Sequence, residues 1–337
     1  MQNIIVNLEF NFGLQYIIRM NLLTLAQEII NGKRLCREDD LSFFKTEDLQ
    51  TLCDAADFIR EKLCGNQIEL CSIINAKSGK CSENCKFCAQ SAVNHTNCKT
   101  YSFCDEAEII SEAQKNQNAG IHRFSLVTSG KALTGKEFEN ALSVYKKMHE
   151  MLKIKLCASM GFLSNEQLSA LKDCGVTCYH HNIETSERNF KNICTTHTYQ
   201  MKIDTLKQVK KAGLRICSGG IIGMGETFED RLEMALALSE IQADSIPINA
   251  LMPVKGTPFE NLQQLSEEEI LRTIAMFRFI NPTAQIRLAA GRKLMKNYGE
   301  KAFKSGANAT ITGNMLTTTG STVEEDIKLI QKLGRIL

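Results

Sequence analysis

The sequence predicts an α/β protein built as a (β/α)8 barrel of the TIM type, with an N-terminal helical cap. Apolar runs of strand length alternate with helical patterns eight times over about 270 residues, as such a barrel requires. A doubly wound open sheet is the alternative arrangement for the same alternation. We therefore expect an N-terminal extension and helical cap over residues 1–65, and the barrel over residues 66–337.

The N-terminal segment is predicted to form two or three helices, over residues 22–30, 45–56 and 55–63. Residues 1–19 are apolar, but they contain Glu9 and lack both a basic start and a small-residue cleavage site, so a signal peptide is not expected. Met20 opens a better amphipathic helix, and the true start is expected at either Met1 or Met20.

The barrel elements follow in order along the chain, each strand as a short apolar run and each helix with apolar residues at helical spacing. The predicted strands occupy residues 67–75, 121–128, 153–160, 176–182, 214–221, 243–250, 284–290 and 308–313. The predicted helices follow them at residues 105–119, 136–151, 165–173, 198–212, 228–242, 267–280, 292–305 and 322–333.

Several helices begin with a residue pair typical of a capping box, in which a serine or threonine precedes an acidic or amide residue by three positions. These pairs begin at Thr134, Ser164, Thr227, Ser266 and Ser321. In a barrel the functional residues lie at the carboxyl ends of the strands, so the segments that follow the predicted strands are the candidates for a site.

The overall composition excludes several classes of function. Forty basic and 38 acidic residues give a net charge of +2 without a block of like charge, so neither nucleic acid nor an anionic membrane is an expected partner. No stretch of consecutive apolar residues approaches the length of a membrane span, which is about 18 residues. Fourteen cysteines without a secretory signal indicate a reducing cytoplasm and metal chemistry rather than disulfides.

The segment after the first predicted strand holds Cys81, Cys85 and Cys88 in a C-x3-C-x2-C pattern. Three thiolates at this spacing can ligate three irons of a cubic iron–sulfur cluster and leave the fourth iron open for a ligand. The alternatives are three unrelated thiols, or a zinc knuckle that adds His95 and Cys98 to the last two cysteines. The zinc knuckle leaves Cys81 unused.

This pattern resembles the radical S-adenosylmethionine enzymes at all three cysteines, and Phe87 matches the aromatic residue usual before the third. The resemblance implies that Cys81, Cys85 and Cys88 hold a [4Fe–4S] cluster. It also implies that S-adenosylmethionine binds the open iron and is cleaved by one electron to a 5′-deoxyadenosyl radical.

Other polar or glycine-rich segments end later strands. Gly220, Gly223 and Gly225 let the backbone approach a ligand closely, although a tight turn is the simpler interpretation. With the cysteine pattern, this segment resembles the glycine-rich S-adenosylmethionine contact of the radical family. Adjacent strand residues point to opposite faces, so at most one of His180 and His181 faces the barrel mouth, and a structural role is favoured.

Asn182 and Glu184 share one face of the fourth strand, and both can address a ligand, with Glu184 suited to a ribose. Asn249 ends the sixth strand and offers both a donor and an acceptor to a cyclic urea or an amide. Arg287 and Arg123 lie within apolar strands, where a charge needs a partner, and an ion pair is the usual explanation.

Taken together, these segments resemble the biotin synthase family over roughly residues 65–335. The segments that carry the resemblance are residues 81–90, 182–186, 195–199, 217–227, 245–258, 287–292 and 316–334. The resemblance implies insertion of sulfur into dethiobiotin to form biotin. The C–H bonds concerned are unactivated, so a radical from the cofactor is needed to open them.

The resemblance also assigns roles to residues. Asn182, Glu184 and Asn249 contact S-adenosylmethionine or the substrate. Lys202 stands where the family usually has arginine, and lysine keeps the positive charge but lacks the two parallel N–H donors of the guanidinium. The family's sulfur source is an auxiliary [2Fe–2S] cluster held by three cysteines and an arginine. Its expected ligands here are Cys157, Cys217 and Arg287, with Ser125 in place of the remaining cysteine.

Serine is a harder and far less acidic iron ligand than cysteine, so Ser125 calls for a substitute. Cys71, Cys157, Cys217 and Arg287 all lie on odd-numbered predicted strands, and alternate strands contribute to one interior layer of a barrel. Our hypothesis is that Cys71 replaces the missing thiolate in an auxiliary cluster whose number of irons differs. The alternative is that Cys71 is a small core residue.

The resemblance further implies a flavodoxin or ferredoxin as reductant, and a homodimer. Two rival functions remain open. One is another radical S-adenosylmethionine enzyme that acts on a small molecule without inserting sulfur, which Ser125 favours. The other belongs to a different class, a zinc-stabilised binding module without redox chemistry. A non-catalytic electron carrier is disfavoured by the open coordination position.

Overall fold

A computed structural model describes residues 21–313 and 320–337. The expectations about residues 1–19 and the start at Met20 lie outside the described residues, as does the beginning of the segment 316–334. Residues 21–30 are helical, and a short 3-10 helix η1 (Ser42–Lys45) precedes the helix α2 (Leu49–Cys64). The segments predicted over residues 45–56 and 55–63 form the single helix α2, so this part of the chain has two α-helices, the lower of the two predicted numbers.

The barrel is closed and all of its strand pairs are parallel. Its strands are β1 (Glu69–Lys77), β2 (Arg123–Thr128), β3 (Lys155–Ser159), β4 (Val176–His180), β5 (Arg215–Cys217), β6 (Gly220–Ile222), β7 (Ser245–Ala250), β8 (Gln285–Leu288) and β9 (Ala309–Ile311). The order runs from β5 through β1 and β9 to β6, and Cys217 pairs with Ser245 to join β5 to β7. This closure confirms the predicted barrel and excludes the open sheet.

The predicted strand 214–221 is split into β5 and β6 at Ser218 and Gly219. A Cβ atom on Gly219 would lie 2.0 Å from the carbonyl oxygen of Pro247, so only glycine fits there. The same holds for Gly220, where a Cβ atom would lie 2.4 Å from the carbonyl oxygen of Glu184. These glycines thus allow backbone segments of the barrel wall to pack closely.

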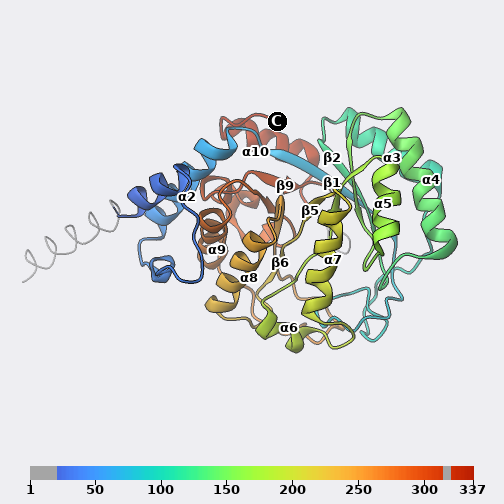
Figure 1. The fold of residues 1–337 in the computed structure, drawn as a ribbon, viewed down its shortest axis with the longest axis horizontal. Coiled ribbons are helices and arrows are strands. Elements are labelled where there is room, and N and C mark those ends of the chain that lie inside the picture. Colours follow the sequence, from blue (N-terminus) through green and yellow to red (C-terminus); the bar gives the residue numbers. More distant parts are fainter. Residues whose placement is uncertain (1–20, 314–319) are drawn as a thin grey trace, which may run out of the picture.

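Helices surround the barrel and mostly follow the predicted positions (Figure 1). They are α3 (Glu106–Asn118), α4 (Gly135–Met151), α5 (Asn165–Asp173), α6 (Glu187–Ile193), α7 (Tyr199–Lys211), α8 (Phe228–Glu240), α9 (Glu267–Ile280) and α10 (Val323–Lys332). The prediction of a helix over residues 292–305 is wrong. This segment forms three short 3-10 helices: η2 (Arg292–Leu294), η3 (Lys296–Tyr298) and η4 (Ala302–Lys304). Asn297 and Gly299 have positive φ angles of 50° and 94°, which interrupt any regular helix.

The capping predictions are confirmed at three helices and wrong at two. Complete capping boxes begin at Ser164, Thr227 and Ser266. Thr134 makes no side-chain cap, since Glu137 instead accepts hydrogen bonds from Lys77 and from the backbone of Phe103. At the last helix the box begins at Thr322 rather than Ser321.

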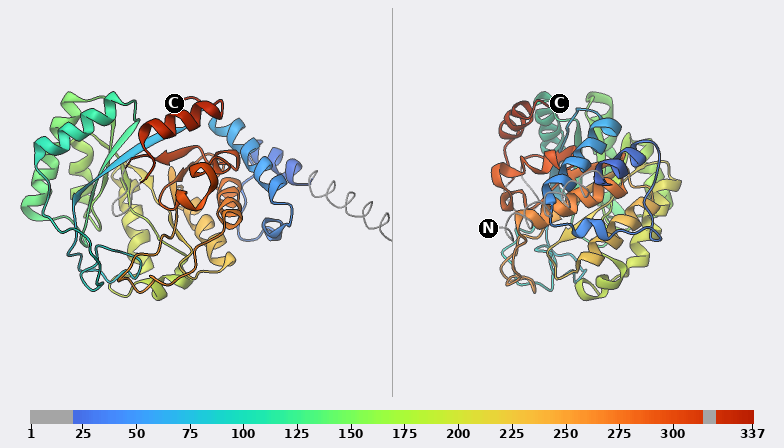
Figure 2. Two further views of the ribbon diagram at one scale, coloured as in Figure 1. Left: turned by 180° about the vertical axis from the view of Figure 1, so that it is seen from behind. Right: turned by 90° about the vertical axis from the view of Figure 1, so that its left-hand side faces the viewer.

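The N-terminal helices lie at one side of the barrel, where α2 packs against α9 (Figures 1 and 2). The division between residues 65 and 66 stays a prediction. Gln67, just before β1, forms a parallel β-bridge with Ile336, which lies near the C-terminus. Within the described ranges, no helix is long and apolar enough to cross a membrane.

A buried ion pair fastens α10 to the barrel. The guanidinium of Arg292 donates to Asp326 at 2.7 and 3.0 Å, and it also donates to the hydroxyls of Thr310 and Ser321. The side chains of Arg292 and Asp326 are only 4% and 2% exposed. This use of Ser321 explains why it does not cap α10.

We expect Asp326→Ala to lower the free energy of unfolding by about 3–5 kcal/mol, because it leaves a buried guanidinium without its counter-charge. The measurement is the urea unfolding midpoint of the full chain under anaerobic conditions. The control is Lys332→Ala, which removes a largely exposed partner of Glu300 and is expected to cost less than about 1 kcal/mol. Equal effects of the two substitutions would contradict the structural role of Asp326.

Candidate functional site

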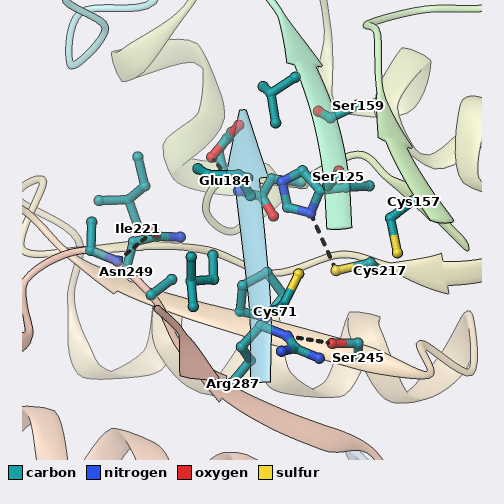
Figure 3. A pocket seen from close by; sticks show the side chains of 18 of the residues that line it. Cys71, Ser125, Cys157, Ser159, Glu184, Cys217, Ile221, Ser245, Asn249 and Arg287 are labelled. Carbon is teal, nitrogen blue, oxygen red and sulfur yellow. Dashed lines mark hydrogen bonds between the residues drawn. The ribbon is translucent and has the colours of Figure 1, made fainter. Parts of the chain in front are cut away.

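A cavity of about 370 Å³ opens at the carboxyl ends of the strands, as the barrel fold predicts. Residues at alternating positions of β1, β2, β3, β4, β7 and β8 line its wall, together with Phe87 and Cys88 from the loop after β1. Figure 3 shows side chains from these strands pointing into one space. The charges and thiols noted in the sequence are therefore brought to a single place.

The loop over residues 78–91, here called the cysteine loop, is held by its own backbone and by one asparagine. The amide N–H of Cys81 donates to the Gln90 carbonyl, and the side chain of Asn94 donates to the carbonyls of Cys85 and Cys88. Burial, with a contribution from Cys81, raises the pKa of the Cys88 thiol to about 11. Cys88 belongs to the lining of the cavity, whereas Cys81 and Cys85 do not.

The zinc-knuckle alternative finds no support in this arrangement. Within the described ranges, the one group of candidate metal ligands that lie close together is Cys85, Cys194 and His197, so it includes neither His95 and Cys98 nor the other two loop cysteines, Cys81 and Cys88. The Cys98 thiol lies instead 3.6 Å from the hydroxyl of Ser78. His95 is tied by its backbone to Gly256.

Asn182 and Glu184 both line the cavity, as their shared parity predicts. Glu184 has a φ angle of 72°, a left-handed conformation that is uncommon for a non-glycine residue and is often found at functional sites. Its backbone carbonyl accepts a hydrogen bond from Ile221, which fixes this geometry. Asn182 donates to the Glu184 carboxylate at 3.4 Å and accepts from the N–H of Gly219.

Lys202 is buried in α7, with its ammonium 3.9 Å from the Glu184 carboxylate and 5.3 Å from the ring centroid of Phe162. The lysine therefore keeps a positive charge beside Glu184. It acts there as a point charge, without the paired donors that an arginine offers.

Asn249 lines the cavity, but its amide is already used by the backbone. It donates to the Gly220 carbonyl at 3.0 Å and accepts from the N–H of Ala290 at 3.1 Å, so one N–H and one lone pair remain for a ligand. Gly220, Gly223 and Gly225 do not belong to the described lining of the cavity; Ile221 does. A direct contact of these glycines with a ligand stays a prediction.

The two arginines of the barrel interior share one carboxylate, that of Glu69. Arg123 donates to Glu69 at 2.9 Å, and Arg287 donates to the other carboxylate oxygen. Arg287 also donates to the hydroxyl of Ser245 at 3.2 Å (Figure 3). Burial opposes ionisation of Glu69, but the charges of Arg287 and Arg123 outweigh it and hold its pKa at about 2. The expected ion-pair partner of both arginines is thus present.

Four thiols meet beside Arg287, and we call them the barrel thiols: Cys71, Cys157, Cys178 and Cys217. Burial raises the pKa of Cys71 to about 12. Interaction with the Cys178 thiol lowers the pKa of Cys157 and of Cys217, and the same interactions raise the pKa of Cys178 well above the ordinary value. Figure 3 shows Cys71, Cys157 and Cys217 around the same part of the cavity.

Cys178 was missed by the sequence analysis, which gave it no role. It precedes His180 and Asn182 by two and four positions, so strand alternation places all three on the inner face. That parity was the available signal. His180 confirms it, since its ring lies in the cavity with Nδ1 3.3 Å from the Cys217 thiol, while His181 is buried outside the lining.

Ser125 lies in the cavity wall between Ile73 and Cys157 of the neighbouring strands. Its hydroxyl is buried and has no hydrogen-bond partner among the described residues. A buried polar atom without a partner is costly, so a polar group bound in the cavity would relieve this cost. The barrel thiols and Arg287 fit an iron–sulfur cluster chemically, whereas the serine hydroxyl is a poor ligand for iron.

The fold and the cysteine loop define the class of protein. Residues 76–238 match the Radical SAM superfamily, and residues 247–336 match the Biotin and Thiamin Synthesis associated domain. The chain is therefore a radical S-adenosylmethionine enzyme, as the three cysteines predict.

Two relatives define the family more closely. A biotin synthase of Alkaliphilus metalliredigens is 58% identical over 94% of this chain and 99% of its own length. A biotin synthase of Clostridium beijerinckii is 57% identical over 92% of this chain and 98% of its own length. This chain belongs to the biotin synthase family.

Solved structures of low sequence identity share the fold. Methylornithine synthase superposes with a TM-score of 0.79 at 20% identity, covering 93% of this chain and 96% of its own. A maturase of the [FeFe]-hydrogenase gives a TM-score of 0.80 at 16% identity, covering 94% of this chain and 75% of its own. These similarities support the barrel architecture and nothing further.

Glu69→Gln tests whether the shared carboxylate stabilises the barrel. The pKa of Glu69 is about 2 in the folded chain against an ordinary 4.5, a difference worth about 3 kcal/mol. Because the folded pKa is lowered, this stabilisation is complete above about pH 4.5 and is lost as the pH falls toward 2. We expect the stability difference between wild type and variant to be constant from pH 7 to 5 and to shrink below 4.5.

The measurement is urea unfolding at a series of pH values. Glu106→Gln is the matched control, because its ion pair with Lys147 is partly exposed and should contribute less than about 1 kcal/mol. A stability difference for Glu69→Gln that stays constant down to pH 3 would show that the carboxylate charge is not responsible.

Proposed function

We propose that this enzyme forms biotin by inserting sulfur into dethiobiotin, with the sulfur drawn from an auxiliary iron–sulfur cluster. The observation that carries the proposal is the cluster of barrel thiols around Arg287, in the same cavity that the cysteine loop covers. A radical enzyme without sulfur insertion has no evident use for four interior thiols. The substrate and the reaction are also those expected of a member of the biotin synthase family.

The cysteine loop is proposed to hold the radical-generating [4Fe–4S] cluster through Cys81, Cys85 and Cys88. When bound, this cluster supplies the electron that cleaves S-adenosylmethionine. The loop contributes rigidity, since Asn94 fixes the carbonyls of two of the three cysteines. Phe87 closes the cavity beside the cluster and keeps water from the reacting cofactor.

Asn182, Glu184 and Lys202 are proposed to bind S-adenosylmethionine from the fourth strand and α7. Glu184 is held in a strained conformation with its carboxylate in the cavity, where it can accept hydrogen bonds from ribose hydroxyls. Lys202 orients that carboxylate at 3.9 Å. Asn249 retains one donor and one acceptor for the cofactor or substrate, and its hydrogen bond to the Gly220 carbonyl holds it in place. The backbone of Gly220, Gly223 and Gly225 is proposed to approach the cofactor.

The auxiliary cluster is proposed to be held by Cys71, Cys157, Cys217 and Arg287, with Cys178 as an additional thiol in the same place. Ser125 is then not required as a ligand. Four thiolates suit a four-iron cluster as well as the [2Fe–2S] cluster implied by the family, so the number of irons is a question for measurement. Glu69 holds Arg287 in position through their ion pair, and Arg123 in turn binds the other oxygen of the same carboxylate.

The upper wall of the cavity suits an apolar substrate chain. Ile73, Val127, Ile221 and Ala289 face the space between the cysteine loop and the barrel thiols. Such a wall excludes water and leaves unactivated C–H bonds to react only with a radical. Dethiobiotin placed there lies between the proposed source of the radical and the proposed source of sulfur.

The partners are proposed from the family and from the thiols. An electron donor of the flavodoxin or ferredoxin type reduces the cysteine-loop cluster, and two copies of the chain form a homodimer. All fourteen cysteines are free, which suits a reducing compartment such as the cytoplasm.

The triple variant Cys81→Ala/Cys85→Ala/Cys88→Ala tests the two-cluster arrangement. We expect it to lose cleavage of S-adenosylmethionine and all biotin formation, yet to keep a second cluster in the barrel. Iron and sulfide content with Mössbauer spectra of anaerobically reconstituted protein are the measurements. An iron-free variant would remove the sulfur source and favour the rival radical enzyme that inserts none.

Single substitutions identify the ligands of the auxiliary cluster. We expect Cys71→Ala and Cys178→Ala each to lower iron and sulfide in the triple-variant background, with biotin yield reduced at least about tenfold when the cysteine loop is intact. Cys174→Ala, at the end of α5 and outside the cavity, is the matched control. Unchanged iron, sulfide and yield in Cys71→Ala would show that Cys71 is a core residue.

A further inference from the structure

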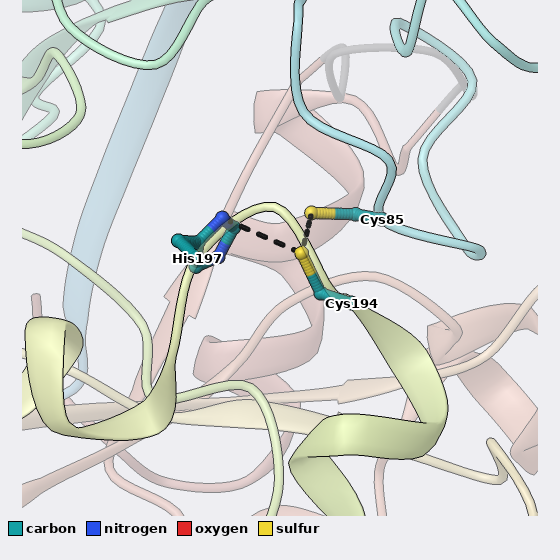
Figure 4. Close-up of side chains that lie close together, drawn as sticks. All are labelled: Cys85, Cys194 and His197. Carbon is teal, nitrogen blue, oxygen red and sulfur yellow. Dashed lines mark hydrogen bonds between the residues drawn. The ribbon is translucent and has the colours of Figure 1, made fainter.

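One group of side chains with metal-ligand donor atoms joins the cysteine loop to the segment before α7, and it contains residues that the proposed reaction does not use. It consists of Cys85, Cys194 and His197, whose ligand atoms all lie within 4.8 Å of one another. Figure 4 shows the two thiols and the imidazole pointing toward a common centre. Cys194 ends α6, and His197 stands just before α7.

The distances within this group suit joint coordination of one ion. The Cys85 and Cys194 sulfur atoms are 3.7 Å apart, and Nδ1 of His197 is 3.4 Å from the Cys194 sulfur. The same Nδ1 lies 2.5 Å from a carboxylate oxygen of Glu83, which is a neighbouring hard donor. Two thiols and an imidazole are the donors that zinc and ferrous iron take in proteins.

The group is built into the fold rather than assembled by chance on the surface. Cys194 and His197 are 3% and 5% exposed, and the imidazole packs between the rings of Phe162 and Phe190. The other ring nitrogen of His197, Nε2, is buried without a hydrogen-bond partner among the described residues. The ring is thus held by packing and by the hydrogen bond between Nδ1 and Glu83, with the Cys194 sulfur close to the same nitrogen.

The chain segment that carries Cys194 and His197 is also tied to the cysteine loop. The side-chain oxygen of Asn84 accepts hydrogen bonds from the backbone N–H groups of Thr195 and Thr196, and its amide donates to the Thr195 hydroxyl at 2.6 Å. The N–H of Lys86 donates to the carbonyl of Ile193. These bonds fix Cys85 next to Cys194, and the Cys85 thiol donates its hydrogen bond there.

We propose that Cys85, Cys194 and His197 bind one divalent transition-metal ion, zinc or ferrous iron, in the chain that has not yet received its cysteine-loop cluster. Binding displaces the thiol protons, together with the proton that Nδ1 of His197 shares with Glu83, to solvent, and no electron changes hands. Occupancy of this site and of the [4Fe–4S] site exclude each other, because Cys85 belongs to both. Only this exclusion rests on the proposed function; binding of the ion does not.

The first experiment measures metal binding to the cluster-free full chain with Co²⁺ as the spectroscopic probe and Zn²⁺ in equilibrium dialysis. The parent protein is Cys81→Ser/Cys88→Ser, which removes the two cysteines that could bind metal with Cys85 independently of the proposed site. We expect the parent protein to show thiolate-to-cobalt charge-transfer bands. We also expect the parent to bind one metal ion more than the same protein with an additional Cys194→Ser or His197→Gln substitution.

The barrel thiols contribute the same background to every protein compared. Adding Cys174→Ser to the parent is the matched control and should change neither stoichiometry nor spectrum. We expect Cys194→Ser to weaken Co²⁺ binding at this site at least about tenfold. The proposal is overturned if both Cys194→Ser and His197→Gln leave the bands and the bound metal unchanged while circular dichroism shows the fold intact.

The second experiment tests the exclusion. Cluster-free protein with the cysteine loop intact is loaded with one equivalent of Zn²⁺ and then reconstituted with iron and sulfide, and cluster formation is followed by its visible absorbance. We expect zinc to slow assembly in the wild type and much less in Cys194→Ser. Equal slowing in both would place the inhibitory zinc on Cys81, Cys85 and Cys88 and contradict the shared site.

Both experiments are independent of biotin formation. A chain that inserts no sulfur would still show the metal site, and a chain that forms biotin could still lack it. Failure of this inference and failure of the proposed function are therefore distinguishable.

Discussion

Two guanidinium groups in the interior of the barrel share one carboxylate, which balances one of their two positive charges. Arg123 and Arg287 both donate to Glu69 at the first residue of β1, where solvent cannot screen them. A buried charge is tolerated only when it is paired and hydrogen-bonded. Because this pairing fixes Arg287, it also fixes the position of the barrel thiols relative to a cationic group.

The side chains that line the cavity beside that ion pair differ in chemical type from its deep end to its mouth. The thiols and the arginine lie deep in the barrel, and Asn182, Glu184 and the cysteine loop lie toward its mouth, with apolar side chains between them. In the proposed function, this arrangement separates the site that would generate a radical from the site that would supply sulfur. Parallel strands make this division possible, since each strand contributes inward residues at two or three depths.

Much of the fold was predictable because alternation and capping are local properties. Strand positions and three capping boxes followed from neighbouring residues alone. The segment 292–305 was predicted as a helix because its apolar spacing is helical, yet left-handed backbone at Asn297 and Gly299 breaks it into 3-10 turns. Ser321 does not cap the last helix because its hydroxyl accepts a hydrogen bond from Arg292, which is distant in sequence, and donates one to Asp326.

The sequence by itself determined the barrel, the three-cysteine loop and the inward face of each strand, because all of these depend on spacing along one segment. Only the tertiary structure decided which inward residues meet. Cys178 joined the barrel thiols, and Cys194 and His197 came to lie beside Cys85, through strand closure and loop contacts between residues about a hundred positions apart. Convergence of that kind has no periodic signal in the chain, since it arises from the packing of whole elements.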